Sequence, residues 1–325
     1  MATVGAATSG NWSSPLVFPM APQAGDIVVA NGNTVTIDQD ITVGTIQTLA
    51  AGIYLSGGQF NVSTDRTINA HALSGTTQCL VASGSANVTH NGNSTGGTTA
   101  ADYGTVWGSS GTLTRVGTIT GGSHASAYGL RVTAGTVQHA GSIVAATASG
   151  ISMAGGTLNW TSGLGTPSSS APAIGLDSGA VLNVTPDWTT NPSTASPIVE
   201  VGASSSVVCQ GDVAAEAGRY PLITLISSTA TATFEGSVTA VDGIAPVRGS
   251  AGGIAVTING NIVCSADGTF PFVCTASTSA AFRFLVHASD ALTHSYVPTG
   301  GGTRTLSTAG VAAAAAFGGM VSRRV

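Results

Sequence analysis

Short runs of alternating apolar and polar residues, each ending at a glycine turn, recur along most of this chain. One run is Leu113-Thr-Arg-Val-Gly117-Thr-Ile119, and the next is Val137-Gln-His-Ala-Gly141-Ser-Ile143. Alternation with a period of two residues is typical of β-strands with one buried face, and glycine favours tight turns. The pattern therefore predicts many short strands separated by turns.

These runs repeat at a nearly constant interval. The steps between the turn glycines from 117 to 141, from 211 to 236 and from 236 to 260 are 24, 25 and 24 residues. A constant period in the range of about 20 to 50 residues is the mark of a repeat architecture, and weaker copies bring the count to about ten.

Each repeat contains three short strands, as in Tyr128–Val132, Thr136–His139 and Ile143–Val144. This content predicts an all-β fold, a right-handed parallel β-helix of about ten coils of about 24 residues. At the usual distance between strands, such a stack would be roughly 48 Å long. A β-sandwich is the alternative, because frequent turn signals suit that fold as well.

Three segments differ in pattern. Residues 1–25 are rich in proline and serine and carry no repeat, so we expect an extended N-terminal arm. Residues 26–268 form the β-helix repeat region. Residues 269–325 contain a cluster of phenylalanines that we expect to cap the open end of the solenoid, followed by a tail.

The composition narrows the class of protein. The chain has 45 glycines in 325 residues, 7% charged residues and 42% hydrophobic residues, and its nine basic residues are all arginines. Disorder needs low hydrophobicity with high charge, and a membrane helix needs an apolar run of about 20 residues, so neither fits. A net charge of −5 offers no basic surface for nucleic acid. The low charge favours a homotrimer with packed flanks.

The chain's beginning and its cysteines suggest a reducing compartment. The first twelve residues have neither a positive region nor an apolar core of the kind found in signal peptides, so we expect the chain to fold where it is made. The cysteines are few and widely spaced, and we expect buried thiols at Cys79, Cys209, Cys264 and Cys274.

A pair of carboxylates is a candidate for glycoside cleavage, because that reaction uses two carboxylates across the scissile bond. Asp187 and Asp212 lie 25 residues apart, which is one period, so they would fall on neighbouring coils. The simpler interpretation is that such carboxylates keep the surface soluble and cap turns. Asp38 and Asp40 have that role in our interpretation, and we expect no enzyme.

Other side chains suggest binding rather than catalysis. Exposed aromatic rings could stack on glycans, and the candidates are Trp107, Trp160 and Trp188, with Tyr103 and Tyr128. The alternative is that these rings pack in the core or at a subunit interface. His90 and His139 each precede a turn glycine by two residues, which places both in one column of the solenoid. The histidines lack metal-ligand spacing, so we expect no metal and no other cofactor.

The N-terminal region carries a further motif. It contains Gly10-Asn-Trp12, then Pro22-Gln-Ala-Gly25-Asp26, and then Asn31-Gly32-Asn-Thr-Val35-Thr-Ile-Asp38. This order resembles the start of β-helices in virion proteins of tailed bacteriophages, and of some carbohydrate-associated modules. The resemblance covers about 30 residues. It implies a homotrimeric virion component that is assembled in the host cytoplasm and contacts other capsid or tail proteins.

The same resemblance implies a function. We expect a non-enzymatic structural protein, a capsid decoration or head fibre that could also adhere to polysaccharide on the host surface. The alternative is a tail fibre or tailspike that cleaves polysaccharide. Neither needs insertion into a membrane.

Overall fold

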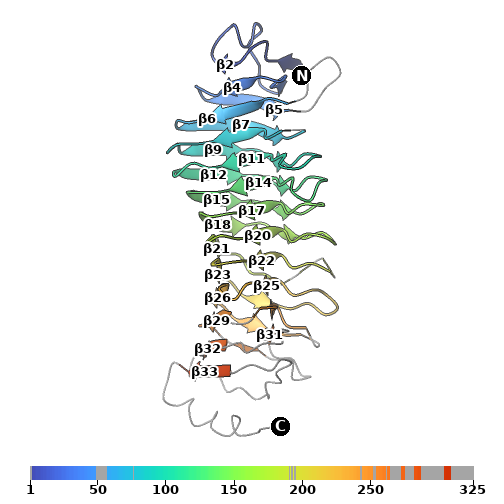
Figure 1. Cartoon of the computed structure of the whole chain (residues 1–325), viewed down its shortest axis with the longest axis vertical. Helices are drawn as coiled ribbons and strands as arrows, with labels where there is room; N and C mark the ends of the chain where they lie inside the picture. Colours follow the sequence, from blue (N-terminus) through green and yellow to red (C-terminus); the bar gives the residue numbers. More distant parts are fainter. Residues whose placement is uncertain are drawn as a thin grey trace. The chain divides into compact units, whose positions relative to one another are not determined.

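The computed structural model describes residues 2–48, 57–75, 77–189, 191, 193, 195–241, 244–251 and 254–260, and the backbone of four later strands. The fold is all-β, without helices among the described residues, and its coils stack as a β-solenoid of about ten turns (Figure 1). The predicted parallel β-helix is therefore confirmed. The β-sandwich alternative is wrong, because the ladders between strands run parallel, whereas sandwich sheets are antiparallel.

Two compact units make up the chain, Met1–Gly175 and Leu176–Val325. The strands of the first unit, together with β20 at its end, are β1 (Thr3–Gly5), β2 (Gly10–Asn11), β3 (Ile27–Val29), β4 (Thr34–Thr36), β5 (Ile41–Gln47), β6 (Gln59–Val62), β7 (Arg66–Leu73), β8 (Leu80–Ala82), β9 (Val88–Asn91), β10 (Ser94–Thr95), β11 (Thr105–Trp107), β12 (Thr112–Val116), β13 (Ile119–Thr120), β14 (Leu130–Val132), β15 (Thr136–Ala140), β16 (Ile143–Val144), β17 (Ile151–Met153), β18 (Thr157–Ser162), β19 (Gly165–Thr166) and β20 (Ile174–Leu176).

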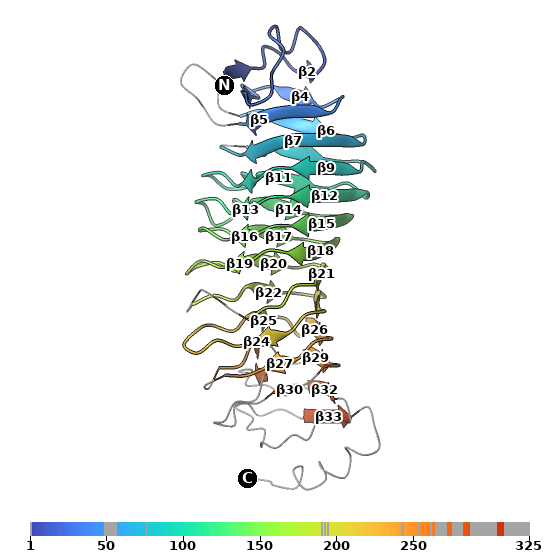
Figure 2. The same cartoon turned by 180° about the vertical axis from the view of Figure 1, so that it is seen from behind.

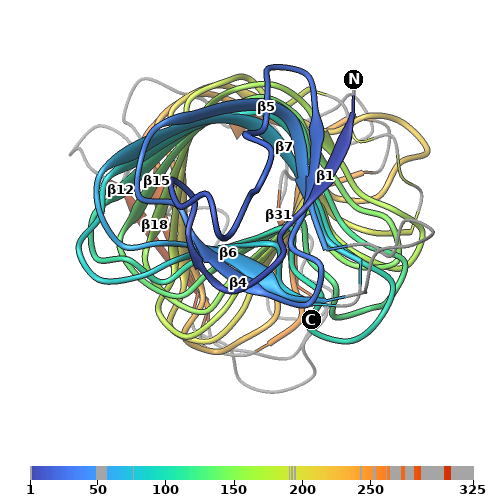
Figure 3. The same ribbon diagram turned by 90° about the horizontal axis from the view of Figure 1, so that it is seen from above.

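Three strands form each regular coil of the first unit. The coil of β12, β13 and β14 pairs with that of β15, β16 and β17, strand by strand and in parallel. Figure 2 shows β13, β16 and β19 on successive coils, and Figure 3 shows the first coils winding past β4 and β6 on one side and β5 and β7 on another. The inward positions align into apolar columns, of which one is Val88, Leu113, Val137 and Leu158, each at most 2% exposed.

Glycines form a column of their own at the turn between the first and second strands. Gly117, Gly141 and Gly163 occupy this turn on three successive coils, with φ angles of 120°, 145° and 109°. A Cβ atom on Gly117 would lie 2.7 Å from the carbonyl oxygen of Gly92, and one on Gly141 would overlap the carbonyl of Gly117. The glycine period in the sequence therefore reflects both backbone conformation and the lack of space between coils.

The segment expected to be an extended arm belongs to the stack instead. Residues of β1 pair in parallel with β3, and β2 pairs with β4. Trp12 is buried, and its ring lies 4.9 Å from that of Phe18 and 6.1 Å from that of Phe60 between centroids. Residues 2–25 thus belong to the first coil, because their backbone groups and aromatic rings complete the otherwise open end of the core.

A polar column crosses the core of the first unit. His90, Arg115 and His139 are aligned on β9, β12 and β15, and each is at most 1% exposed. The guanidinium donates to Ser94 Oγ at 3.1 Å and to the carbonyl of Gly92 at 3.0 Å. The predicted histidine column is confirmed, and Arg115, which was not predicted to belong to it, lies between its two histidines.

Burial is the main cause of the altered pKa values in this column. It lowers the pKa of Arg115 to about 9, and, together with the charge of Arg115, it lowers the pKa of His90 and of His139 to about 3. Both imidazoles are therefore neutral in the folded chain near pH 7.

The second unit, Leu176–Val325, repeats the same design. Its strands are β21 (Val181–Val184), β22 (Val199–Val201), β23 (Ser206–Cys209), β24 (Val213–Ala214), β25 (Ile223–Leu225), β26 (Thr231–Phe234), β27 (Val238–Thr239), β28 (Val247–Gly249), β29 (Ala255–Ile258), β30 (Ile262–Val263), β31 (Phe272–Cys274), β32 (Phe282–Val286) and β33 (Arg304–Thr308). Leu182, Val207, Ala232 and Val256 form one of its apolar columns.

The other predictions concern the limits of the domains and the state of the cysteines. The boundary between the units, at Gly175, falls inside the predicted repeat region 26–268. Apart from the strands β31, β32 and β33, the expected cap and tail at 269–325 lie outside the described residues. Cys79 and Cys209 are buried free thiols, as expected. Cys264 and the side chain of Cys274 also lie outside the described residues.

We expect the buried histidines to make the first unit sensitive to acid. The unfolded chain protonates its histidines below about pH 6.5, whereas the folded chain keeps His90 and His139 neutral down to about pH 3. The free energy of unfolding should therefore be nearly constant between about pH 7 and pH 8 and fall as the pH drops through 6 and 5. Urea titrations at a series of pH values measure this, and H139L should give a shallower slope. Equal slopes for H139L and the parent chain would contradict the assignment.

A substitution in the glycine column should lower stability. We expect G141A to reduce the free energy of unfolding by about 2 kcal/mol or more, because the new methyl group meets both an unfavourable φ and the carbonyl of Gly117. G175A is the matched control, since its Cβ would contact Ser149 Oγ at 3.9 Å and nothing nearer. Urea denaturation compares the two variants, and equal midpoints would refute the steric argument.

Candidate functional site

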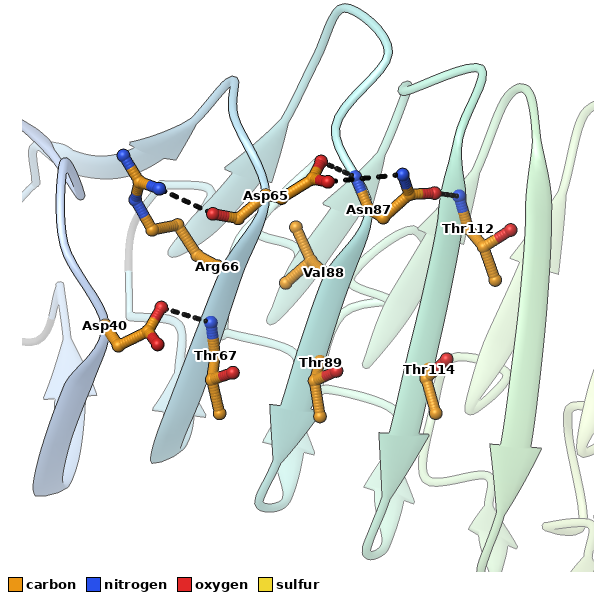
Figure 4. A pocket seen from close by; sticks show the side chains of 9 residues that line it. All are labelled: Asp40, Asp65, Arg66, Thr67, Asn87, Val88, Thr89, Thr112 and Thr114. Atoms are coloured by element: carbon orange, nitrogen blue, oxygen red, sulfur yellow. Dashed lines mark hydrogen bonds between the residues drawn. The ribbon is translucent and has the colours of Figure 1, made fainter.

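A pocket of about 330 Å³ opens on the outer surface of the first unit, where β7, β9 and β12 begin (Figure 4). Four coils supply its walls, since Asp40 lies directly before β5, on the coil before β7. Its lining consists of two carboxylates, one guanidinium, one amide, four hydroxyls and one apolar side chain, from Asp40, Asp65, Arg66, Asn87, Thr67, Thr89, Thr112, Thr114 and Val88.

Strand alternation and register bring the threonines of the pocket together. Thr67, Thr89 and Thr114 occupy aligned positions on β7, β9 and β12. Their neighbours His90 and Arg115 point into the core, so the pleat turns the three threonines outward. Aligned positions on neighbouring strands lie about 4.8 Å apart, which gives a regular row of hydroxyls.

The acidic and amide side chains of the pocket join one coil to the next. Asp40 Oδ1 accepts the amide of Thr67 at 2.8 Å, and Asp65 Oδ1 accepts the amide of Asn87 at 2.7 Å. Asn87 Oδ1 in turn accepts the amide of Thr112 at 2.9 Å. These bonds satisfy backbone donors at the starts of the strands and hold the side chains in fixed positions (Figure 4).

Arg66 supplies the positive charge of the pocket. Its Nη1 donates to the carbonyl of Asp65 at 2.6 Å, while its Nε is buried without a partner among the described residues. The charge of Arg66 also reaches Asp38. Burial raises the pKa of that carboxyl group, but hydrogen bonds from Ser13 and the charge of Arg66 together hold it below its usual value.

The candidate catalytic pair lies in the second unit. Asp187 and Asp212 are on neighbouring coils, as predicted, and both side chains are exposed. Asp187 Oδ1 accepts the amide of Asp212 at 2.8 Å, and Asp212 Oδ1 accepts the amide of Ser237 at 2.7 Å. The two carboxylates therefore join coils at a turn, in the same way as Asp40 and Asp65. Asp38 accepts the amide of Ser13 and Asp40 that of Thr67, so these two carboxylates also join one coil to the next.

The three candidate tryptophans do not form an exposed stacking surface. Trp107 and Trp160 are 0% exposed and Trp188 is 4% exposed. Each tryptophan occupies a position of its strand or bridge whose side chain points inward. Its ring therefore fills the core and cannot stack on a glycan. Trp160 also donates to the carbonyls of Gly141 and Ser162. The glycan-binding prediction for these residues is wrong, and the core alternative holds.

The tyrosines named with them remain partly exposed. Tyr103 and Tyr128 stack on each other with centroids 5.6 Å apart, and the guanidinium of Arg131 lies 5.7 Å from the centre of Tyr128. The Tyr128 ring is therefore in contact with both Tyr103 and Arg131.

The pocket was missed at the sequence level. Its residues are separated by intervals such as 25 residues between positions 40 and 65 and 22 between 65 and 87. A signal was present, because an Asx residue precedes an alternating run on consecutive coils.

Among the described residues, no helix is long and apolar enough to cross a membrane. Across the same residues, no cluster of three histidine, cysteine or acidic side chains could hold a metal ion. No protein-family model, no curated protein and no solved structure matches this chain.

We expect Asp187 to stabilise the second unit through its hydrogen bond to the next coil. D187A should lower the free energy of unfolding by about 1 kcal/mol, because the exposed turn loses an acceptor for the Asp212 amide. D187N is the control, since its amide oxygen accepts the same bond. Urea titration distinguishes them, and equal stability of D187A and the parent chain would show that the bond contributes nothing.

Proposed function

We propose that this chain is a non-enzymatic structural protein of a bacteriophage particle, a homotrimeric surface component that decorates the capsid or forms a head fibre. One observation carries the non-enzymatic part: Asp187 and Asp212 each commit an oxygen to the backbone of the next coil. The virion assignment is supported by the N-terminal motif and by the β-solenoid fold. Assembly takes place in the host cytoplasm, with other capsid or tail proteins as partners.

The residues of the N-terminal motif support this proposal through what they do. Asp26 accepts the amides of Ala2 at 2.7 Å and Gln23 at 3.0 Å, and Asp38 accepts the amide of Ser13. Asn31 and Gly32 form a turn with φ angles of 54° and 76°. The motif therefore builds the first coil, which is the structural role expected of the start of a β-helix.

The scarcity of charge supports the trimer. Nine basic and 14 acidic residues in 325 leave few ions for solvation, and the described residues contain one ion pair, between Arg219 and Glu216 at 3.8 Å. Flanks that pack against identical copies need fewer solvated ions. In the trimer that we propose, neighbouring copies cover part of the polar but uncharged outer surface.

A second candidate function is a tail fibre or tailspike that cleaves polysaccharide. The position of Asp187 and Asp212 on neighbouring coils favours it, because two carboxylates about 5 Å apart suit a retaining glycosidase. The hydrogen bonds from Asp212 and Ser237 count against it, since moving either carboxylate toward a substrate leaves a backbone amide without a partner.

The two candidates differ in where the protein is found and in what it does to glycans. We expect the chain in purified phage particles, remaining with emptied heads after the tails are removed, as followed by mass spectrometry. We also expect the purified protein to release no reducing ends from host polysaccharide. Release of reducing ends that D187N or D212N abolishes would overturn the structural proposal, and recovery with the tails would overturn the head location.

A further inference from the structure

The pocket of the first unit offers acceptors that the links between coils leave unused. Asp40 bonds the Thr67 amide through Oδ1, and its second oxygen has no partner among the described residues. Asp65 bonds the Asn87 amide through Oδ1, and its Oδ2 receives a long contact of 3.5 Å from the Asn87 side chain. Each carboxylate can therefore accept a further hydrogen bond from a ligand.

The pocket also offers unused donors. Arg66 donates through Nη1 to the Asp65 carbonyl, and its Nη2 makes no hydrogen bond within the described part of the chain. A guanidinium group carries five N–H donors, so this nitrogen can donate to an acceptor on a ligand. The hydroxyls of Thr89, Thr112 and Thr114 line the same space without hydrogen bonds to the described residues, and a hydroxyl both donates and accepts.

The charges in the pocket restrict what it can bind. Asp40 and Asp65 against Arg66 leave one net negative charge, and Asp38 lies within electrostatic reach of Arg66. An anionic ligand would be repelled. A neutral molecule with several neighbouring hydroxyls matches the mixture of acceptors and donors, because each hydroxyl can donate to a carboxylate while it accepts from the guanidinium.

We propose that this pocket binds one sugar unit of an uncharged glycan without cleaving it. The sugar hydroxyls donate to Asp40 and Asp65, accept from Arg66, and lie over the threonine row. The inference rests on the proposed surface role of the protein and gives that role a ligand class. With a volume of about 330 Å³ and no aromatic ring in the lining, the pocket binds each unit weakly, with a Kd on the order of 1 mM.

Many copies on one particle would compensate for weak single sites. Because binding to a polymer becomes intramolecular after the first contact, several weak pockets together hold a polysaccharide tightly. A weak pocket on a repeated surface protein is therefore useful for adhesion.

Saturation-transfer NMR on the full chain tests this inference. The neutral probes are maltotriose and N,N′-diacetylchitobiose, and the charged probes are digalacturonic acid and glucosamine. We expect at least one neutral probe to bind with a Kd on the order of 1 mM and the anionic probe not to bind. R66Q and T112V should each weaken binding by about fivefold or more, since each removes a donor.

T136V is the matched control for T112V. Thr136 is aligned with Thr112 on the next coil but lies outside the lining of the pocket, so T136V should bind as the parent chain does. Urea titration confirms that each variant is folded. Equal losses in T112V and T136V, a preference for the anionic probe, or no binding of a neutral probe at about 20 mM would overturn the inference.

A failure of sugar binding can be distinguished from a failure of the proposed virion role. Particles that carry T112V or R66Q should contain the protein in normal amount, because neither change touches the bonds between coils. Absence of the parent chain from particles would refute the virion role whether or not the pocket binds sugars.

Discussion

The parallel hydrogen-bonded stacking of coils is the constraint on which the rest of this structure depends. Because neighbouring strands lie about 4.8 Å apart, each position on a coil recurs directly beneath its equivalent on the next. At the turn of Gly117, Gly141 and Gly163 this spacing leaves no room for a Cβ atom. At the strand starts it places a side-chain acceptor such as Asp65 or Asn87 next to a backbone amide of the following coil. The high glycine content and the positions of the acidic side chains therefore have the same cause, which is the close stacking of the coils.

The same constraint explains how a chain with so few charges is stable. Backbone ladders satisfy the peptide groups and apolar columns fill the interior, so surface ion pairs are not needed; the pair of Arg219 and Glu216, at 3.8 Å and 38% exposure on each side, contributes little. Arg115 differs from the charged side chains of that pair, because its charge lies in the core. It is buried between two histidines and is held by Ser94 and the Gly92 carbonyl. Among the described residues no carboxylate forms an ion pair with Arg115, so burial of that cation costs stability that the apolar columns offset.

The period predicted the fold because each coil repeats its turn glycine and its inward apolar residues at the same interval. The alternation of side chains along a strand could also have predicted that the tryptophans are buried. Trp160 follows Leu158 by two residues and therefore points to the same, inward side of its strand. The first coil was harder to predict, because Thr3–Gly5 lacks the glycine period and pairs with Ile27–Val29 across a proline-rich loop. The pocket depends on exact register between four coils, which the sequence leaves open by one or two residues.

Ligand binding and coil stacking use the same side chains, and this sharing favours binding over catalysis. Asp40, Asp65 and Asn87 are fixed by backbone amides before a ligand arrives, so little side-chain freedom is lost on binding. A carboxylate that has to move toward a reacting atom to come within hydrogen-bond reach gives up this fixed position. Any such adjustment here leaves a backbone amide unsatisfied. The same penalty applies to Asp187 and Asp212, which accept backbone amides of the next coil. The solenoid can therefore present a rigid binding surface without losing these hydrogen bonds. A catalytic pair that has to move would break them.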